Sequence, residues 1–145
     1  MSGQMILNKS IERGDFKTGG EASSKLKDLL RKLGVESSIV RRITIVTYEL
    51  EMNIIIHSKG GEIRAEVTPE LIKVVAADKG PGIKDIERAF QPGYSTASDE
   101  IREMGFGAGM GLNNVQHYSD DLDVKSELGM GTMITACVSL GGESL

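Results

Sequence analysis

A glycine-rich run in the second half of the chain is suited to bind phosphate. The sequence GFGAGMG fills residues 105–111 and leads into LNNVQHY, which we expect to be a helix. Glycines just before a helix N-terminus let several backbone N–H groups converge on an anion that the helix dipole also favours. The spacing fits neither a Walker loop nor the dinucleotide pattern G-x-G-x-x-G. A flexible tether is the alternative interpretation of the run.

An aspartate at the end of an apolar strand is a second candidate for chemistry. Asp78 follows LIKVVAA and precedes KGPGI, so on its own it is most simply a turn former. A carboxylate held over a pocket floored by glycines would instead accept a hydrogen bond from an exocyclic amine. Gly80 and Gly82 would let the backbone pass close to a flat ring. The hydroxyl of Thr132 would join the same network.

Three polar side chains spaced by four form the third candidate. Glu49, Asn53 and His57 lie in the segment ELEMNIIIH, which is otherwise apolar enough for a core. The spacing places them in one stripe along a helix, each turned by about 40° from the last, whereas Glu51 points roughly opposite. A histidine at a helix end is more often a capping residue than a catalytic one. Composition alone does not explain the stripe.

The elements that must position these residues follow from periodicity and from cap and turn signals. Thr18 and Glu21 form a T-x-x-E capping box for a helix that stops at Gly34, and Arg41 and Arg42 fit a solvated helix face. The other predicted elements are a strand over 5–13, a long helix over Ser37–His57, strands over 62–68 and 71–77, a short helix over 84–90, an aperiodic loop over 91–104, and strands over 122–126 and 132–140.

Length and composition set the outer bounds. The chain has 145 residues with 39% hydrophobic and 26% charged residues, which predicts one compact domain. The net charge is -4 and no long basic run occurs, so we expect neither nucleic acid nor an anionic membrane as principal partner. The single cysteine, Cys137, and the lack of a long apolar stretch make the cytoplasm the expected location.

The order of four motifs resembles the boxes of the GHKL ATPase superfamily. These are Glu49-x-x-x-Asn53, then DKGPGI at 78–83, then GFGAGMG at 105–111, then GMGT at 129–132. The short chain, the segment NIIIH and the stretch FQPGYST are similar to the bacterial anti-sigma-factor-type serine/threonine kinases of partner-switching circuits. The likeness spans residues 35–138 and is vague before residue 35. It implies that residues 1–145 form a single ATP-binding kinase domain.

The resemblance also implies a fold class. Members of the superfamily have the Bergerat ATP-binding fold, an α/β structure. We therefore expect a two-layer α/β sandwich whose mixed, mainly antiparallel sheet carries its helices on one face.

The resemblance assigns expected roles to individual residues, with ATP and Mg²⁺ as cofactors. Asn53 would hold the magnesium ion that bridges the phosphates, and Glu49 would be the catalytic residue that orients or deprotonates the nucleophile. Asp78 would bind the adenine amino group, with support from Thr132. Residues 91–104 would form a mobile ATP lid. The other implied nucleotide-binding positions are Gly80, Gly82, Ile83, Gly105, Gly107, Ala108, Gly109, Met110, Gly111 and Leu112.

Three functional classes are compatible with these motifs. A protein kinase would use Glu49 to activate a serine or threonine of a partner, an ATPase clamp would activate water, and a binding module would use ATP only to set its shape. The resemblance favours the kinase. It implies a substrate of the anti-sigma-factor-antagonist type, names a sigma factor or a phosphatase as other clients, and leaves a homodimer open.

Overall fold

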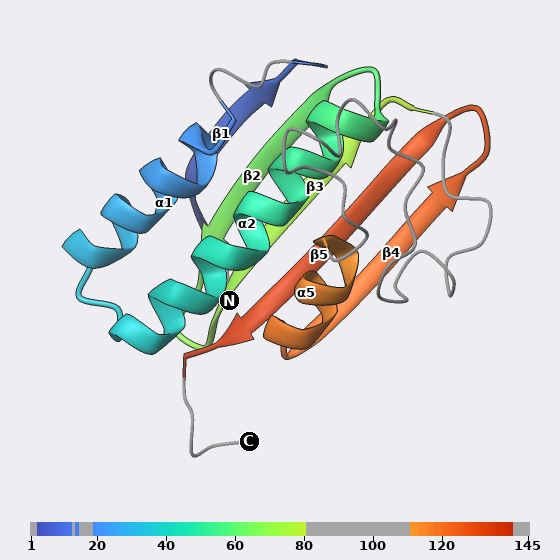
Figure 1. The fold of residues 1–145 in the computed structure, drawn as a ribbon. Helices are drawn as coiled ribbons and strands as arrows, with labels where there is room; N and C mark the ends of the chain where they lie inside the picture. The colour runs from blue at the N-terminus through green and yellow to red at the C-terminus, as the bar shows by residue number, and fades with distance from the viewer. Residues whose placement is uncertain (1–2, 13, 15–18, 81–110, 141–145) are drawn as a thin grey trace.

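A five-stranded sheet and three helices make up the described part of the chain (Figure 1). The computed structural model describes residues 3–12, 14, 19–80 and 111–140. In chain order the elements are β1 (Gln4–Ile11), α1 (Glu21–Lys32), α2 (Ser37–His57), β2 (Gly61–Val67), β3 (Leu71–Asp78), α5 (Gly111–Tyr118), β4 (Asp121–Glu127) and β5 (Gly131–Ser139).

The sheet has the strand order β1-β2-β3-β5-β4. Every pairing among these strands is antiparallel, which confirms the mainly antiparallel sheet expected from the sequence. Two short turns generate the hairpins β2–β3 and β4–β5, and the first is closed by the Thr68 N–H, which donates to the Leu71 carbonyl at 2.9 Å. The predicted strand near the N-terminus is β1, at one edge. The central strands β3 and β5 pair from Leu71 opposite Ser139 to Asp78 opposite Thr132.

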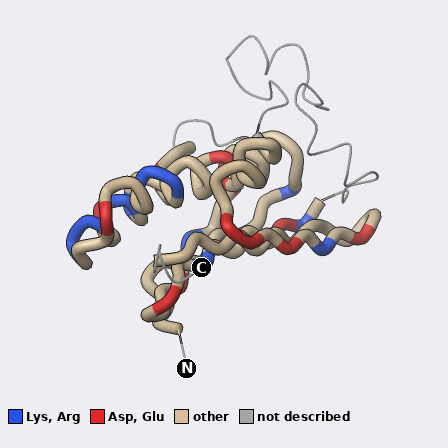
Figure 2. The backbone as a smooth tube through the Cα atoms, turned by 90° about the horizontal axis from the view of Figure 1, so that it is seen from below, with Lys and Arg blue, Asp and Glu red and all other residues tan. Residues whose placement is uncertain are grey.

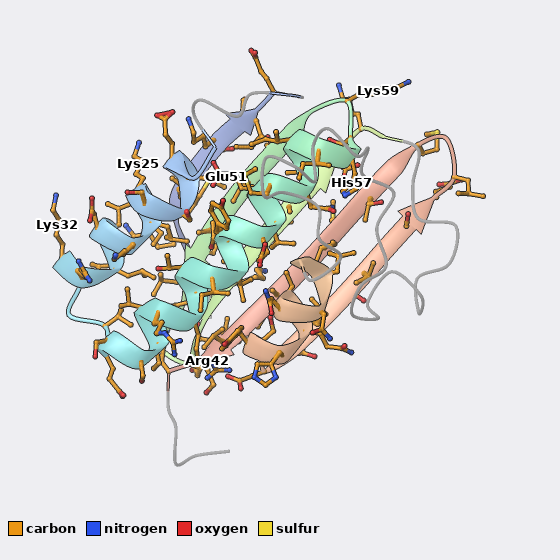
Figure 3. All side chains as sticks on the ribbon, in the orientation of Figure 1. Lys25, Lys32, Arg42, Glu51, His57 and Lys59 are labelled. Carbon is orange, nitrogen blue, oxygen red and sulfur yellow. The ribbon has the colours of Figure 1, made fainter. Side chains whose placement is uncertain are left out.

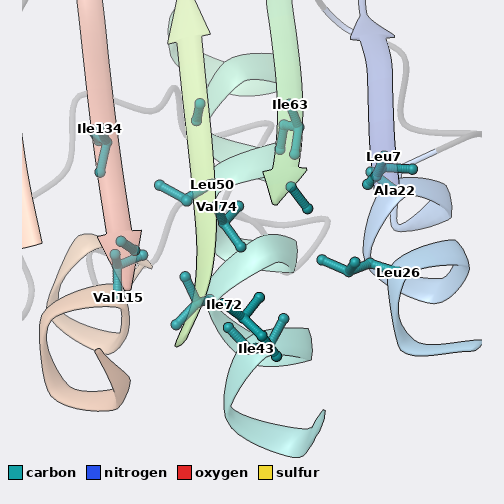
Figure 4. Packing of buried hydrophobic residues seen from close by; sticks show 14 of the residues in the cluster. Leu7, Ala22, Leu26, Ile43, Leu50, Ile63, Ile72, Val74, Val115 and Ile134 are labelled. Atoms are coloured by element: carbon teal, nitrogen blue, oxygen red, sulfur yellow. The ribbon is translucent and has the colours of Figure 1, made fainter. Parts of the chain in front are cut away.

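The helices cover one face of the sheet, as Figure 2 shows in a view turned by 90°. Buried residues alternate along β5, and half-buried residues alternate with exposed ones along β4, which is the period-two pattern of a sheet with one covered face. Each fully buried aliphatic side chain contributes about 1.5–3 kcal/mol. The expected two-layer α/β sandwich is therefore confirmed. Its core includes Leu26, Leu30, Ile43, Val46, Leu50, Ile54, Ile63, Ile72, Val74, Val115 and Ile134 (Figure 4).

Helix α2 is the long central helix that the apolar pattern predicts. Its 21 residues run from Ser37 to His57, or about 30 Å. The helix ends where Ser58 turns to an extended conformation and donates from its hydroxyl to the Ile54 carbonyl at 2.7 Å. Within the described ranges, the structure contains no helix with the length and apolar character needed to span a membrane.

The start of helix α1 differs from the predicted capping box. The helix begins at Glu21, its cap position is Gly20 with a φ of 98°, and no cap side chain bonds to its first turn. Thr18, the predicted cap, lies outside the described residues. The first-turn N–H groups are instead met by a carboxylate from α2, which lies on the side of that helix facing α1 (Figure 3).

That carboxylate belongs to Glu51, whose side chain is only 1% exposed. Its Oε2 accepts the N–H of Ala22 at 3.1 Å and its Oε1 accepts the N–H of Ser23 at 3.3 Å. Burial raises the pKa of Glu51, and the amide hydrogen bonds and the charge of Lys9 offset this only in part. A negative group at a helix N-terminus is favoured by the helix dipole. Glu51 therefore ties α1 to α2.

Replacing Glu51 with alanine should destabilise the fold. The change leaves two amide N–H groups without their acceptor, and an unsatisfied buried donor costs about 1–3 kcal/mol. Urea unfolding followed by circular dichroism should show a lower midpoint, and hydrogen exchange should be fastest at the start of α1. Glu51→Gln should fall between wild type and Glu51→Ala, because a glutamine offers one acceptor oxygen.

Glu49→Gln is the matched control for Glu51→Gln, because it makes the same Glu-to-Gln change two residues away on the opposite side of α2. Its unfolding midpoint should stay close to that of the wild type. A Glu51→Ala variant with the wild-type midpoint would show that the carboxylate does not hold α1.

Candidate functional site

The C-terminal end of α2 is joined to the end of strand β3. The Lys59 N–H donates to the Lys79 carbonyl at 2.7 Å, and the Lys79 N–H donates to the Gly60 carbonyl at 2.9 Å. Gly80 is buried, and a Cβ there would lie 3.2 Å from both the Ser58 Cβ and the Asp78 Oδ1. The helix that carries the polar stripe therefore ends beside the carboxylate of Asp78.

Asp78 is the last residue of β3 and is fixed by its neighbour on β5. Its Oδ1 accepts the backbone N–H of Thr132 at 3.2 Å. The Thr132 hydroxyl lies 2.9 Å from the hydroxyl of Ser126 on β4, so three strands contribute to one polar cluster. The sequence placed Asp78 and Thr132 together and missed Ser126. A polar residue on the inner face of β4 was the signal that could have found it.

The surroundings of Asp78 disfavour its charged form. Burial raises the pKa of this carboxyl group, and the hydrogen bond from the Thr132 amide offsets only part of that effect. The Thr132 amide engages Oδ1, and among the described residues no donor to the other oxygen, Oδ2, is found. A half-buried carboxylate in this setting is suited to an amine donor.

Two glycines allow the neighbouring strands to approach Asp78 closely. A Cβ on Gly61 of β2 would overlap the Ala77 carbonyl oxygen, and a Cβ on Gly131 of β5 would overlap the Asp78 carbonyl oxygen. Gly131 also has a φ of 137°, a conformation that other residues rarely adopt. The sequence indicated glycines around Asp78 but did not single out Gly61, because its partner strand was needed to see the contact.

The polar stripe of α2 faces helix α5 at Glu49. The Oε2 atom of Glu49 accepts a hydrogen bond from the Asn114 Nδ2 at 2.7 Å. Asn114 lies three residues after Gly111, the last glycine of the run, so this carboxylate lies near the start of α5. Asn53 and His57 follow along α2, both half-buried, and burial lowers the pKa of His57. Asn114 was missed, since nothing in the sequence links it to Glu49.

Arg42, expected on a solvated helix face, is partly exposed and also bonds to the end of α5 and the residues after it. Its Nε donates to the carbonyl of Tyr118, the last residue of α5, at 3.1 Å, and its Nη2 contacts the Asp120 Oδ1 at 2.9 Å (Figure 3). Asp120 also accepts the Ser139 N–H at 2.7 Å. Burial alone would raise the pKa of Asp120. The hydrogen bonds from Ser139 and Arg42 and the Arg42 charge outweigh burial, so the pKa lies below its usual value. This fixes the C-terminal end of α5. Arg41 is exposed, as expected.

Several predicted site residues lie outside the described part of the chain. Gly80, Gly111 and Leu112 are inside it, and Leu112 packs against the core. The predicted helix over 84–90 and the predicted lid over 91–104 fall outside. So do Gly82, Ile83, Gly105, Gly107, Ala108, Gly109 and Met110.

The described residues form two polar clusters, one around Asp78 and one around Glu49. In the first, the Asp78 Oδ1 accepts the Thr132 amide. In the second, the Glu49 Oε2 accepts the Asn114 side-chain amide. The N-terminus of α5 follows the glycine run there and favours an anion. The Asp78 cluster thus has the chemistry to accept an amine donor, and the start of α5 has the chemistry to favour an anion.

Comparison with known proteins shows which family the chain resembles. A family model for histidine kinase-, DNA gyrase B-, and HSP90-like ATPases matches residues 38–142. The serine/threonine-protein kinase RsbT of Bacillus subtilis is 32% identical over 114 residues, which cover 76% of this chain and 80% of RsbT. An anti-sigma F factor of Caldanaerobacter subterraneus is 34% identical over 105 residues, which cover 72% of this chain and 66% of the factor.

A solved structure shows the same fold. The crystal structure of the SiaB-SiaC complex from Pseudomonas aeruginosa contains a chain that matches with a TM-score of 0.63 at 14% identity. The match covers 92% of this chain and 89% of that chain. The expected fold class is thereby confirmed by a second route.

Replacing Gly131 with alanine should disturb the Asp78 end of the sheet. The new Cβ would overlap the Asp78 carbonyl, which costs about 1–3 kcal/mol by overpacking, and the backbone conformation costs about 1–2 kcal/mol more. Chemical unfolding should show a loss of about 2–5 kcal/mol in stability. Amide NMR shifts should change most around Asp78 and Thr132.

Gly129→Ala is the control in the same turn. Gly129 has a φ of 81°, but a Cβ there would have no atom of the described residues within 4 Å, so only the conformational cost of about 1–2 kcal/mol applies. Equal losses in the two variants would contradict the close approach of β5 to Asp78.

Proposed function

Since the chain belongs to the family of histidine kinase-, DNA gyrase B- and HSP90-like ATPases, we propose that it works as a serine/threonine protein kinase on a small antagonist protein of a partner-switching circuit. The family uses ATP. Relatives named as a serine/threonine kinase and as anti-sigma F factors align with most of this chain, in agreement with the resemblance read from the motifs. The observation that carries the proposal is the carboxylate of Glu49 beside the start of α5.

We assign the nucleotide end of the site to Asp78 and Thr132. The free oxygen of Asp78 would accept a hydrogen bond from the adenine amino group, and the Thr132–Ser126 hydroxyl pair would support it. Gly80 would line the ring, since it lies so close to Asp78 that a Cβ there would be 3.2 Å from the Asp78 Oδ1. The backbone amides of the glycine run, which ends at Gly111, would bind phosphate. Gly82, Ile83 and residues 105–110 keep their roles as predictions.

We assign magnesium to Asn53. Mg²⁺ in nucleotide sites takes one or two protein oxygens and completes its octahedron with phosphate oxygens and water. Asn53 fits this need, because it offers a carboxamide oxygen from a half-buried position one turn beyond Glu49. When bound, the ion would neutralise charge on the phosphates.

Glu49 is the group that we assign to the chemical step. Its carboxylate takes the proton from the serine or threonine hydroxyl of the partner as that oxygen forms a bond to the γ-phosphorus of ATP. The bond from the γ-phosphorus to the bridging oxygen breaks, and its electron pair leaves with ADP. The products are phosphoserine or phosphothreonine, ADP and the proton on Glu49. Positioning and electrostatics dominate such reactions.

The choice of partner is supported by the names of the relatives, a serine/threonine kinase and an anti-sigma F factor. We favour an anti-sigma-factor antagonist as the substrate. A sigma factor or a phosphatase would be a further client, in the cytoplasm. The acting form would be a homodimer. An ATPase clamp, in which Glu49 activates water, is the alternative. ATP turnover without transfer to any partner would favour it.

Asp78→Asn should weaken ATP binding by about ten- to a hundredfold, because an unmatched buried polar contact costs about 1–3 kcal/mol. The asparagine oxygen can still accept the Thr132 N–H, so the strand end should stay in place. Calorimetric titration with ATP and magnesium chloride would measure the change. Asp120→Asn is the control, because Asp120 accepts an amide at the other end of β5.

The pH dependence of binding gives a second readout for Asp78. Its raised pKa means that the carboxylate takes up a proton at a higher pH than an exposed aspartate does. Wild-type affinity should therefore decline as the pH falls toward that pKa, whereas Asp78→Asn should show only the titration of the nucleotide itself. Parallel curves, or an unchanged affinity in the variant, would refute the adenine assignment.

Glu49→Gln should lower phosphoryl transfer by about a hundredfold to ten-thousandfold, which is the usual contribution of a general base. ATP affinity should change little, because glutamine is nearly isosteric and its oxygen can accept the Asn114 amide. The assay uses γ-labelled ATP and candidate small antagonist proteins from the native host. Asn53→Ala should differ by weakening magnesium-dependent binding as well.

Two outcomes would count against the kinase. Wild-type transfer rates in Glu49→Gln would make Glu49 a structural carboxylate. Bound ATP that is neither transferred to any candidate partner nor hydrolysed would favour a binding module.

A further inference from the structure

Helices α2 and α5 are joined by a side-chain hydrogen bond that has no role in the chemical step proposed above. The Asn114 Nδ2 donates to the Glu49 Oε2 at 2.7 Å, between residues 65 positions apart in the chain. The bond is partly buried and joins the carboxylate to the first turns of α5. The donor is a neutral carboxamide, which can donate a hydrogen bond to a carboxylate oxygen.

We propose that Asn114 is a positioning residue for phosphoryl transfer. Its amide holds one oxygen of the Glu49 carboxylate and thereby aims the other oxygen at the hydroxyl that loses its proton. This inference rests on the proposed kinase function. It adds a residue that orients the proton acceptor, Glu49. Asn114 itself forms no bond to the reacting atoms.

The packing of α5 fixes its orientation, and this orientation determines the contact between Asn114 and Glu49. Val115, the next residue, is fully buried in the core and fixes which face of α5 meets α2 (Figure 4). Arg42 holds the other end of α5 through the Tyr118 carbonyl at 3.1 Å. With its rotation and its far end fixed, α5 presents the Asn114 amide to Glu49.

The chemistry explains why a held carboxylate matters. A free glutamate side chain samples several rotamers, whereas proton abstraction needs its oxygen within hydrogen-bond reach of the hydroxyl. A displacement of about 1 Å in a reacting group costs up to about a hundredfold in rate. Loss of the amide should therefore affect the chemical step and leave nucleotide binding intact.

A double-mutant cycle tests the proposal in the full-length chain. Asn114→Ala should lower single-turnover transfer from γ-labelled ATP by about tenfold to a hundredfold, with ATP affinity within about threefold of wild type. In the Glu49→Gln background the same change should lower the residual rate by less than about threefold, because the carboxylate that it positions is already gone. Gln116→Ala, at an exposed position of α5, should match the wild type.

Asn114→Asp is the isosteric second variant, which keeps the shape and removes the donor. It places two carboxylates together, so it should lose at least as much activity as Asn114→Ala, and thermal unfolding should show both variants folded. Wild-type transfer by Asn114→Ala, or equal losses in both backgrounds of the cycle, would overturn the positioning role while the kinase stands. A wild-type chain that transfers no label would overturn the kinase proposal and this inference with it.

Discussion

The rotation of α2 about its own axis is the constraint on which the rest of the structure depends. Glu49 and Glu51 are two residues apart, so the helix turns them by about 200° and they face opposite neighbours. One meets Asn114 on α5, and the other meets the amides of Ala22 and Ser23 on α1. A helix turned differently would lose both contacts. The same rotation buries Ile43, Leu50 and Ile54 against the sheet.

The helix and strand positions could be predicted because they depend on local patterns. The bounds of α2 match the apolar run from Ser37 to His57, and β3 matches the continuous run that ends on Asp78. The start of α1 could not be predicted, since Glu51 takes over the capping and lies 28 residues from Ser23 in the chain. The sequence did carry one signal: a carboxylate on the core side of an apolar helix needs a buried hydrogen-bond donor.

The site divides in the same way. The order of the motifs was enough to place Asp78 and Thr132 at one end and Glu49 near the glycine run at the other. Contacts between distant segments were not accessible, because Asn114, Ser126 and the partners of Arg42 become neighbours only through the sheet order and the packing of α5. Each motif that identifies the family is thus a short continuous segment, whereas the residues that hold the motifs in place come from distant segments.

Strand β5 is fixed at both ends by aspartates, and this limits how the chain can vary in length. Asp78 accepts the amide of Thr132 at one end, and Asp120 accepts the amide of Ser139 at the other. Inserting or deleting one residue between them would break one contact and turn the strand's buried side chains to the opposite face. The turn before the strand exposes Leu128 and Met130, which are 63% and 69% accessible. Evolutionary insertions are therefore more easily accommodated in that turn than within β5.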